Sequence, residues 1–160
     1  MRYTTNHDVT SSDGSTIEIY KGKQGALAAF VLAACMDGVP LLYNGQEVGS
    51  PKKINFFIKD PIDWSTNPDM VQAYKQILNV RASSEAIKTG TLTAYNHTDI
   101  VAFEKKAGAE AFLVLVNVRN TAKDFQVPAA LAGTSWKDQL TNASLTMGTS
   151  ITLPAFGYLM

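Results

Sequence analysis

Helical periodicity disappears after Thr89, and this change constrains the fold more than any other feature of the sequence. Before it, two long stretches carry apolar residues at helical spacing. After it, the chain consists of short runs rich in β-branched and aromatic residues, separated by Gly, Asn, Asp and Pro. The sequence therefore predicts a boundary near Gly90, between a mixed portion, 1–88, and an all-β portion, 89–160.

The two predicted helices have recognisable ends. The first covers 24–36 and is followed by an Asp-Gly stop signal. The second begins at Asn67, an N-cap candidate, with Pro68 at the first helical position and Asp69 in the first turn, and runs to about Ser83. Their apolar stripes are Leu27, Phe30, Val31, Ala34 and Cys35 in the first helix, and Val71, Tyr74, Ile77 and Leu78 in the second.

Two short stretches in the front portion have the character of strands. Residues 2–6 are rich in Tyr and Thr, and residues 39–43 form an apolar run that ends in Asn-Gly. The polar, Gly-containing residues 9–21 predict a loop between the first strand and the first helix. Two strands joined by a helix are expected to pair in parallel, which leaves open sheet edges on both sides. A (β/α)₈ barrel needs about 250 residues, so 1–88 is roughly a third of one.

The back portion predicts an antiparallel sandwich of roughly six to eight strands, packed on the helix that starts at Asn67. Its short runs occur at the spacing typical of such folds, and none of them has useful helical periodicity. These runs are TLTAY, DIVAFEK, AFLVLVNV, KDFQV, SLTM, SITL and FGYLM.

Composition excludes several classes of partner and cofactor. The 14 basic and 14 acidic residues balance, which argues against nucleic acid and against an anionic membrane surface as partners. Cys35 is alone, so no internal disulfide forms, and no apolar run approaches the ~20 residues that span a bilayer. Asp13, Asp60 and Asp63 match no calcium-loop spacing, so we expect neither metal nor cofactor. The sequence assigns no cellular compartment.

Several stretches, in order along nearly the whole chain, resemble the alpha-amylase family of glycoside hydrolases (family 13). Residues 2–8, RYTTNHD, resemble the family's fourth signature region, in which Asn-His-Asp ends the seventh barrel strand. Residues 38–47, GVPLLYNGQE, resemble its G-x-P-x-x-Y-x-G-x-E stretch on the eighth strand. The other similar positions are Asp60–Trp64 before the last helix, Arg81, Ala86 and Gly90 at the junction, Asn117 after a sandwich strand, and Leu153–Tyr158 in the closing strand.

This resemblance implies a fold, a function and a set of site residues. The fold is the last two βα units of a (β/α)₈ barrel, 1–88, followed by a C-terminal β-sandwich, 89–160. The implied function belongs to a retaining hydrolase of α-1,4-glucans such as starch and maltooligosaccharides. Asp8 is the implied transition-state stabiliser, His7 and Asn6 bind the substrate, and Tyr43 and Glu47 support the site.

The same resemblance implies that the chain is inactive alone. The family's nucleophile, in a G-x-R-x-D context, and its acid/base Glu lie on strands four and five. No acid in the present sequence has such a context. We therefore expect the chain to be a piece of a longer enzyme that carries one rim of its active site. With its barrel edges open, we also expect it to self-associate through residues 1–60, or to leave that region loosely ordered.

Alternative interpretations remain for the Asn-His-Asp motif, for the two tryptophans and for the chain as a whole. Asn6-His7-Asp8 is also what a helix cap or turn cluster looks like. Trp64 and Trp136 are either platforms for a sugar ring or packing residues, and for both the packing interpretation is favoured. The alternative for the whole chain is a non-catalytic relative of the family that serves as a carbohydrate-binding or partner-binding module.

Overall fold

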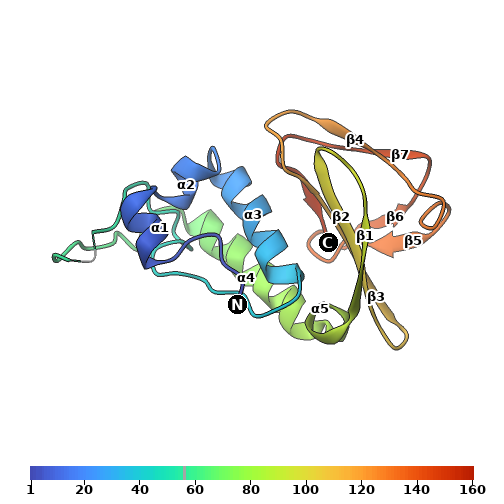
Figure 1. Cartoon of the computed structure of the whole chain (residues 1–160), viewed down its shortest axis with the longest axis horizontal. Coiled ribbons are helices and arrows are strands. Elements are labelled where there is room, and N and C mark those ends of the chain that lie inside the picture. Colours follow the sequence, from blue (N-terminus) through green and yellow to red (C-terminus); the bar gives the residue numbers. More distant parts are fainter. Residues whose placement is uncertain (56) are drawn as a thin grey trace. The chain divides into compact units, whose positions relative to one another are not determined.

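In the computed structural model, which describes residues 1–55 and 57–160, helices occupy the first half of the chain and antiparallel strands the second (Figure 1). The chain divides into two compact units, Met1–Asn79 and Val80–Met160. This division lies before the predicted boundary at 88, because the short helix α5 (Glu85–Thr89) packs on strands of the second unit. The assignment of the two portions to a barrel and a sandwich domain stays a prediction.

Two long helices confirm the periodicity of the front portion. They are α3 (Lys23–Cys35) and α4 (Pro68–Ser83). Asn67 precedes α4 as predicted. Its Nδ2 donates to the carbonyl of Val48 at 3.0 Å, which ties the start of α4 to the preceding connection.

The predicted loop over 9–21 is wrong, because two short helices form there. They are α1 (His7–Ser12) and α2 (Thr16–Ile19). A reciprocal capping box holds α2: the Glu18 amide donates to Ser15 Oγ, and the Ser15 amide donates to the Glu18 carboxylate at 2.8 Å. These hydrogen bonds from Ser15 lower the pKa of Glu18. Caps thus stabilise helices that are too short to show periodicity.

Helices α3 and α4 pack through aromatic and charged contacts. The rings of Phe30 and Tyr74 meet edge to face, with their centroids 4.6 Å apart. Lys23 Nζ forms an ion pair with Asp69 at 3.0 Å, which lowers the pKa of Asp69. All five predicted stripe residues of α3 are buried. The fully buried stripe of α4 is Met70, Tyr74 and Ile77, whereas Val71 and Leu78 are half-buried.

The two predicted strands of the front portion are reduced to one parallel bridge, between Arg2 and Pro40. The Arg2 amide donates to the Val39 carbonyl at 2.8 Å, and the Leu41 amide donates to the Arg2 carbonyl at 2.7 Å. Parallel pairing is therefore confirmed, but continuous strands over 2–6 and 39–43 are not. Parallel sheets occur almost only with both faces covered and several strands side by side. Two parallel segments without further strands therefore do not form a longer hydrogen-bonded ladder.

The second unit contains eight antiparallel strands in three sheets, which agrees with the predicted strand number. Four strands form one sheet in the order β1-β2-β3-β8, while β4 pairs with β7 and β5 with β6. One apolar core joins all three sheets, with Ala102, Leu115, Phe125 and Met147 among its buried members. As predicted, no helix follows Gly90 in the described residues. The strands are β1 (Thr91–Tyr95), β2 (Ile100–Ala107), β3 (Glu110–Asn117), β4 (Lys123–Gln126), β5 (Ser135–Lys137), β6 (Ser144–Thr146), β7 (Ser150–Leu153) and β8 (Tyr158–Leu159).

Charged side chains fix α5 on this unit at both of its ends. At the start, the Ser84 hydroxyl and the Glu85 amide both donate to the Glu110 carboxylate, at 2.5 and 3.0 Å. At the end, the buried Lys105 Nζ donates to the Ile87 carbonyl at 2.7 Å. These bonds satisfy helix-terminal backbone groups and explain why a five-residue helix is stable here.

Candidate functional site

The Arg2–Pro40 bridge brings the two motifs of the front portion to one edge. Because the two segments run parallel, the residues that follow them in sequence leave the bridge in the same direction. Asn6-His7-Asp8 and Tyr43–Glu47 therefore lie on the same side of the bridge, as expected for functional groups at the carboxyl ends of neighbouring barrel strands.

Gln46 locks these two segments together. Its side chain is buried, and its Nε2 donates to Thr4 Oγ1 at 2.7 Å and to the Tyr74 hydroxyl at 3.3 Å. Its Oε1 accepts from the Tyr43 amide at 3.2 Å. One amide thus connects the segment before Asn6, the segment after the second bridge residue, and helix α4. The sequence motif itself predicts no role for Gln46.

Tyr20 adds a second support to the same segment. Its hydroxyl donates to the Thr4 carbonyl at 3.1 Å, and burial raises the pKa of this phenol. Gly25, in the first turn of α3, allows this close approach, since a Cβ there would lie 1.8 Å from the Tyr20 carbonyl oxygen. The sequence signal for Tyr20 was a lone aromatic residue in a polar stretch, which is too weak to assign a partner.

Asn6 is the N-cap of α1, so the capping interpretation holds for this residue. Its Oδ1 accepts from the Val9 amide at 2.9 Å, and its backbone is extended. The cap orients the first turn of α1, in which His7 and Asp8 lie. The Nδ2 donors of Asn6 and the second lone pair of its Oδ1 can still bond another molecule.

His7 and Asp8 project from this first turn into solvent. Their side chains are 59% and 73% exposed, and His7 Nε2 lies 3.4 Å from Asp8 Oδ1. Two adjacent polar groups, one able to donate and one able to accept, can together bind hydroxyl groups. The local fold therefore presents this pair as an exposed rim.

Tyr43 and Glu47, the two predicted support residues, are both half-buried. Within residues 1–55 and 57–160, Glu47 Oε2 is the buried side-chain oxygen or nitrogen that has no hydrogen-bond partner. Burying such an oxygen without a donor costs about 1–3 kcal/mol, so Glu47 is a position where an additional donor would be stabilising.

The recess beside this rim is too small for a sugar. Its volume is about 10 Å³, roughly the space of one water molecule, and polar side chains such as Thr5, Thr10 and Ser50 line it. A larger ligand would therefore contact His7 and Asp8 from the solvent side.

Three large apolar side chains of the connection between Glu47 and helix α4 are exposed to solvent. Phe57 is 82% exposed, Ile58 66% and Trp64 55%, so most of the Trp64 indole does not pack against protein. Near its start, Lys53 Nζ donates to the Ser12 carbonyl at 2.5 Å, which ties the connection to α1.

The candidate calcium ligands are not brought together. Hydrogen bonds from Lys52 lower the pKa of Asp60, and those from Ser65 lower the pKa of Asp63. In the described part of the chain, no group of three or more His, Cys, Asp or Glu side chains is placed to hold a metal ion. The helices described there are also too short or too polar to cross a membrane.

Comparison with known proteins confirms the resemblance to the alpha-amylase family. No family model matches the chain. It is 24% identical over 139 residues to Alpha-amylase 2 of Dictyoglomus thermophilum, a match that covers 79% of this chain and 24% of that protein. The chain therefore spans about a quarter of this curated relative.

Solved structures show the same likeness of fold. The alpha-amylase of Geobacillus thermoleovorans, complexed with acarbose, is similar over 98% of this chain and 37% of its own, with a TM-score of 0.76 and 13% identity. The acarbose-soaked debranching enzyme of Nostoc punctiforme is similar over 98% and 32%, with a TM-score of 0.70 and 21% identity. The fold of this chain thus corresponds to about a third of each of these enzymes.

Proposed function

We propose that this chain is the C-terminal part of an alpha-amylase-type retaining glycoside hydrolase that acts on α-1,4-glucans. In this proposal residues 1–88 are the last two βα units of the (β/α)₈ catalytic barrel, and residues 89–160 are the C-terminal sandwich. The similarity to enzymes of this family over most of the chain supports the assignment.

The observation that carries the proposal is the exposed His7–Asp8 pair beside the Arg2–Pro40 bridge. Asp8 accepts hydrogen bonds from hydroxyl groups of the sugar at the cleavage point. Its negative charge also stabilises the positive, oxocarbenium-like transition state, and these interactions strengthen as that charge develops. His7 donates to the same sugar.

The other site residues act through this pair. Asn6 caps α1 and offers its Nδ2 to the substrate, while Tyr43 and Glu47 support the rim. The partnerless Glu47 Oε2 favours a parent protein in which a further segment donates to it.

In this proposal the chain alone does not hydrolyse glycosides. A retaining mechanism needs a nucleophile and an acid/base whose carboxyl groups are about 5–5.5 Å apart. Asp8 supplies neither role, and the side chain beside it is the His7 imidazole, with Nε2 3.4 Å from Asp8 Oδ1. The chain should therefore show no turnover of soluble starch or of an aryl maltoside.

A chimaera tests the active-site role. The matched quarter of Alpha-amylase 2 from Dictyoglomus thermophilum is replaced by the corresponding residues of this chain, and starch hydrolysis is measured. We expect activity, and a loss of kcat of about 10²-fold or more for Asp8→Asn, because a group that stabilises the transition state is removed. Asp13→Asn, a nearby exposed acid, is the matched control and should leave kcat unchanged.

An equal kcat in the Asp8→Asn and Asp13→Asn chimaeras would refute the role of Asp8. Turnover by the isolated chain would refute its dependence on missing residues. The second candidate function, a non-catalytic carbohydrate- or partner-binding module, would give a folded but inactive chimaera. An intact Asp8 favours the enzyme, since a binding module has no chemical need for a transition-state carboxylate.

A further inference from the structure

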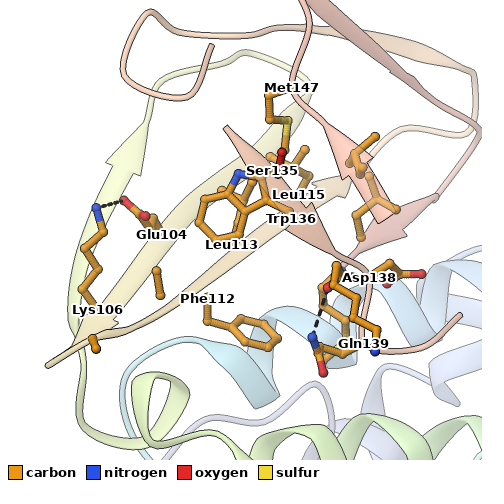
Figure 2. A pocket seen from close by; sticks show the side chains of 16 residues that line it. Glu104, Lys106, Phe112, Leu113, Leu115, Ser135, Trp136, Asp138, Gln139 and Met147 are labelled. Atoms are coloured by element: carbon orange, nitrogen blue, oxygen red, sulfur yellow. Dashed lines mark hydrogen bonds and ion pairs between the residues drawn. The ribbon is translucent and has the colours of Figure 1, made fainter. Parts of the chain in front are cut away.

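A hollow of about 530 Å³ opens within the second unit, far larger than the recess beside the rim. Figure 2 shows it between the inner face of the four-stranded sheet and the β5–β6 pair. Leu113 and Leu115 of β3 line it from the sheet, and Trp136 of β5 from the opposite pair. Its volume falls within the range of about 300–1,000 Å³ that is usual for small-molecule sites.

A buried carboxylate lies where the strand pattern calls for an apolar residue. Ile100, Ala102 and Glu104 alternate along the same face of β2, and the first two belong to the apolar core. Glu104 is only 6% exposed, yet its side chain lines the hollow. A charged group at an inner strand position is unfavourable unless it is paired or binds something, so this position breaks the pattern of the sandwich.

Glu104 is held in place but not saturated. The Tyr95 hydroxyl donates to its Oε2 at 3.2 Å, and Lys106 Nζ lies 3.0 Å from the same oxygen. A carboxylate has about four acceptor positions on its two oxygens. The carboxylate is therefore oriented by protein groups and retains acceptor capacity for a ligand.

Trp136 is half-buried and packs against the apolar core, as the packing interpretation predicted, and its side chain also lines the hollow. Its Nε1 donates to Thr134 Oγ1 at 2.7 Å, and that hydroxyl in turn donates to the Leu131 carbonyl at 2.6 Å. The indole is thus fixed in orientation before any ligand arrives, which reduces the entropy lost on binding.

The charges on the hollow favour a neutral ligand. Its lining contains two acids, Glu104 and Asp138, and two lysines, Lys106 and Lys137, so their formal charges cancel. A ligand suited to this lining has an apolar face for the indole and hydroxyl groups for the carboxylate. Pyranose rings combine both, since their C–H groups form the face and their hydroxyls the edge.

We propose that this hollow binds a short neutral oligosaccharide, with Trp136 packed on a pyranose face and the Glu104 carboxylate accepting hydrogen bonds from its hydroxyls. All residues of the hollow belong to the second unit, so this site is independent of the His7–Asp8 rim and of the hydrolysis proposed above.

Tryptophan fluorescence tests the proposal directly. The sequence has two tryptophans, so the full chain with Trp64→Phe reports on Trp136 alone. Maltotriose and cellotriose are titrated into it separately. We expect a saturable change in emission with at least one sugar, with a Kd of about 1 mM.

Two further variants assign the binding to the hollow. Glu104→Gln keeps the shape but removes the charge, and should raise the Kd about tenfold. Asp124→Asn alters a carboxylate on β4 that bonds Thr152 outside the hollow, and should leave the Kd unchanged. Circular dichroism checks that each variant is folded. No saturable change with either sugar would overturn the proposal, even without the variants, and so would an unaltered Kd in Glu104→Gln.

Discussion

Replacing Gln46 with leucine tests whether one buried amide holds the candidate rim together. The change removes three hydrogen bonds, to Thr4 Oγ1, to the Tyr74 hydroxyl and from the Tyr43 amide. Each contributes about 1 kcal/mol net, and the Tyr43 N–H and Thr4 hydroxyl lose a partner within a largely buried region. The first unit should therefore lose about 3 kcal/mol of stability, a large part of the 5–15 kcal/mol of a typical domain.

Native-state hydrogen exchange at the Tyr43 amide measures this loss locally, which avoids assuming that the two units unfold together. A double-mutant cycle with Thr4→Val isolates the Gln46–Thr4 bond and should give a coupling of about 1 kcal/mol. Gln76→Leu, on the exposed side of α4, is the matched control and should change stability by less than about 0.5 kcal/mol. Unchanged Tyr43 exchange in Gln46→Leu, or a coupling near zero, would refute this account of the rim.

Three further predictions concern the rest of the chain. Asn117→Ala should destabilise the second unit by about 3 kcal/mol in chemical denaturation, because this fully buried amide donates to three backbone carbonyls; a loss below about 1 kcal/mol would contradict it. Hydrogen bonds from Arg119, and secondly from Lys123, lower the pKa of Asp99 in the folded state. The ionised Asp99 therefore stabilises the fold above about pH 4, and this stabilisation is lost as the pH falls through the lowered folded-state pKa. Asp99→Asn should therefore flatten the acid limb of stability against pH, and an unchanged limb would show that these exposed ion pairs do not matter. Light scattering and limited proteolysis should find self-association or early cleavage within residues 1–60, whereas a monomer that is uniformly resistant would refute the open-edge argument.

Secondary structure was predictable where periodicity extends over several turns. Helices α3 and α4 have 13 and 16 residues, enough for their apolar stripes to be recognised. Helices α1 and α2 have six and four residues, and only their caps mark them. The Ser15–Glu18 capping box was readable in the sequence as S-T-I-E and would have predicted α2.

The site was predictable as a set of motifs but not as a set of contacts. Family resemblance selected Asn6, His7, Asp8, Tyr43 and Glu47, and their roles stay predictions. It did not identify Gln46 as the connecting residue, because hydrogen bonds between positions 42 apart in sequence leave no local pattern. It likewise could not reveal a hollow, which depends on how two sheets are spaced.

Because Asn6 caps α1, the His7–Asp8 pair is carried by the first turn of a helix and not by the loop that follows it. The segment between α1 and α2, around Gly14, can therefore gain or lose residues over evolutionary time without displacing the pair. Related chains should differ most in length just after α1 and remain constant in length between Arg2 and Asp8. The geometry of the rim is therefore set by the start of helix α1 and not by the length of the loop that follows this helix.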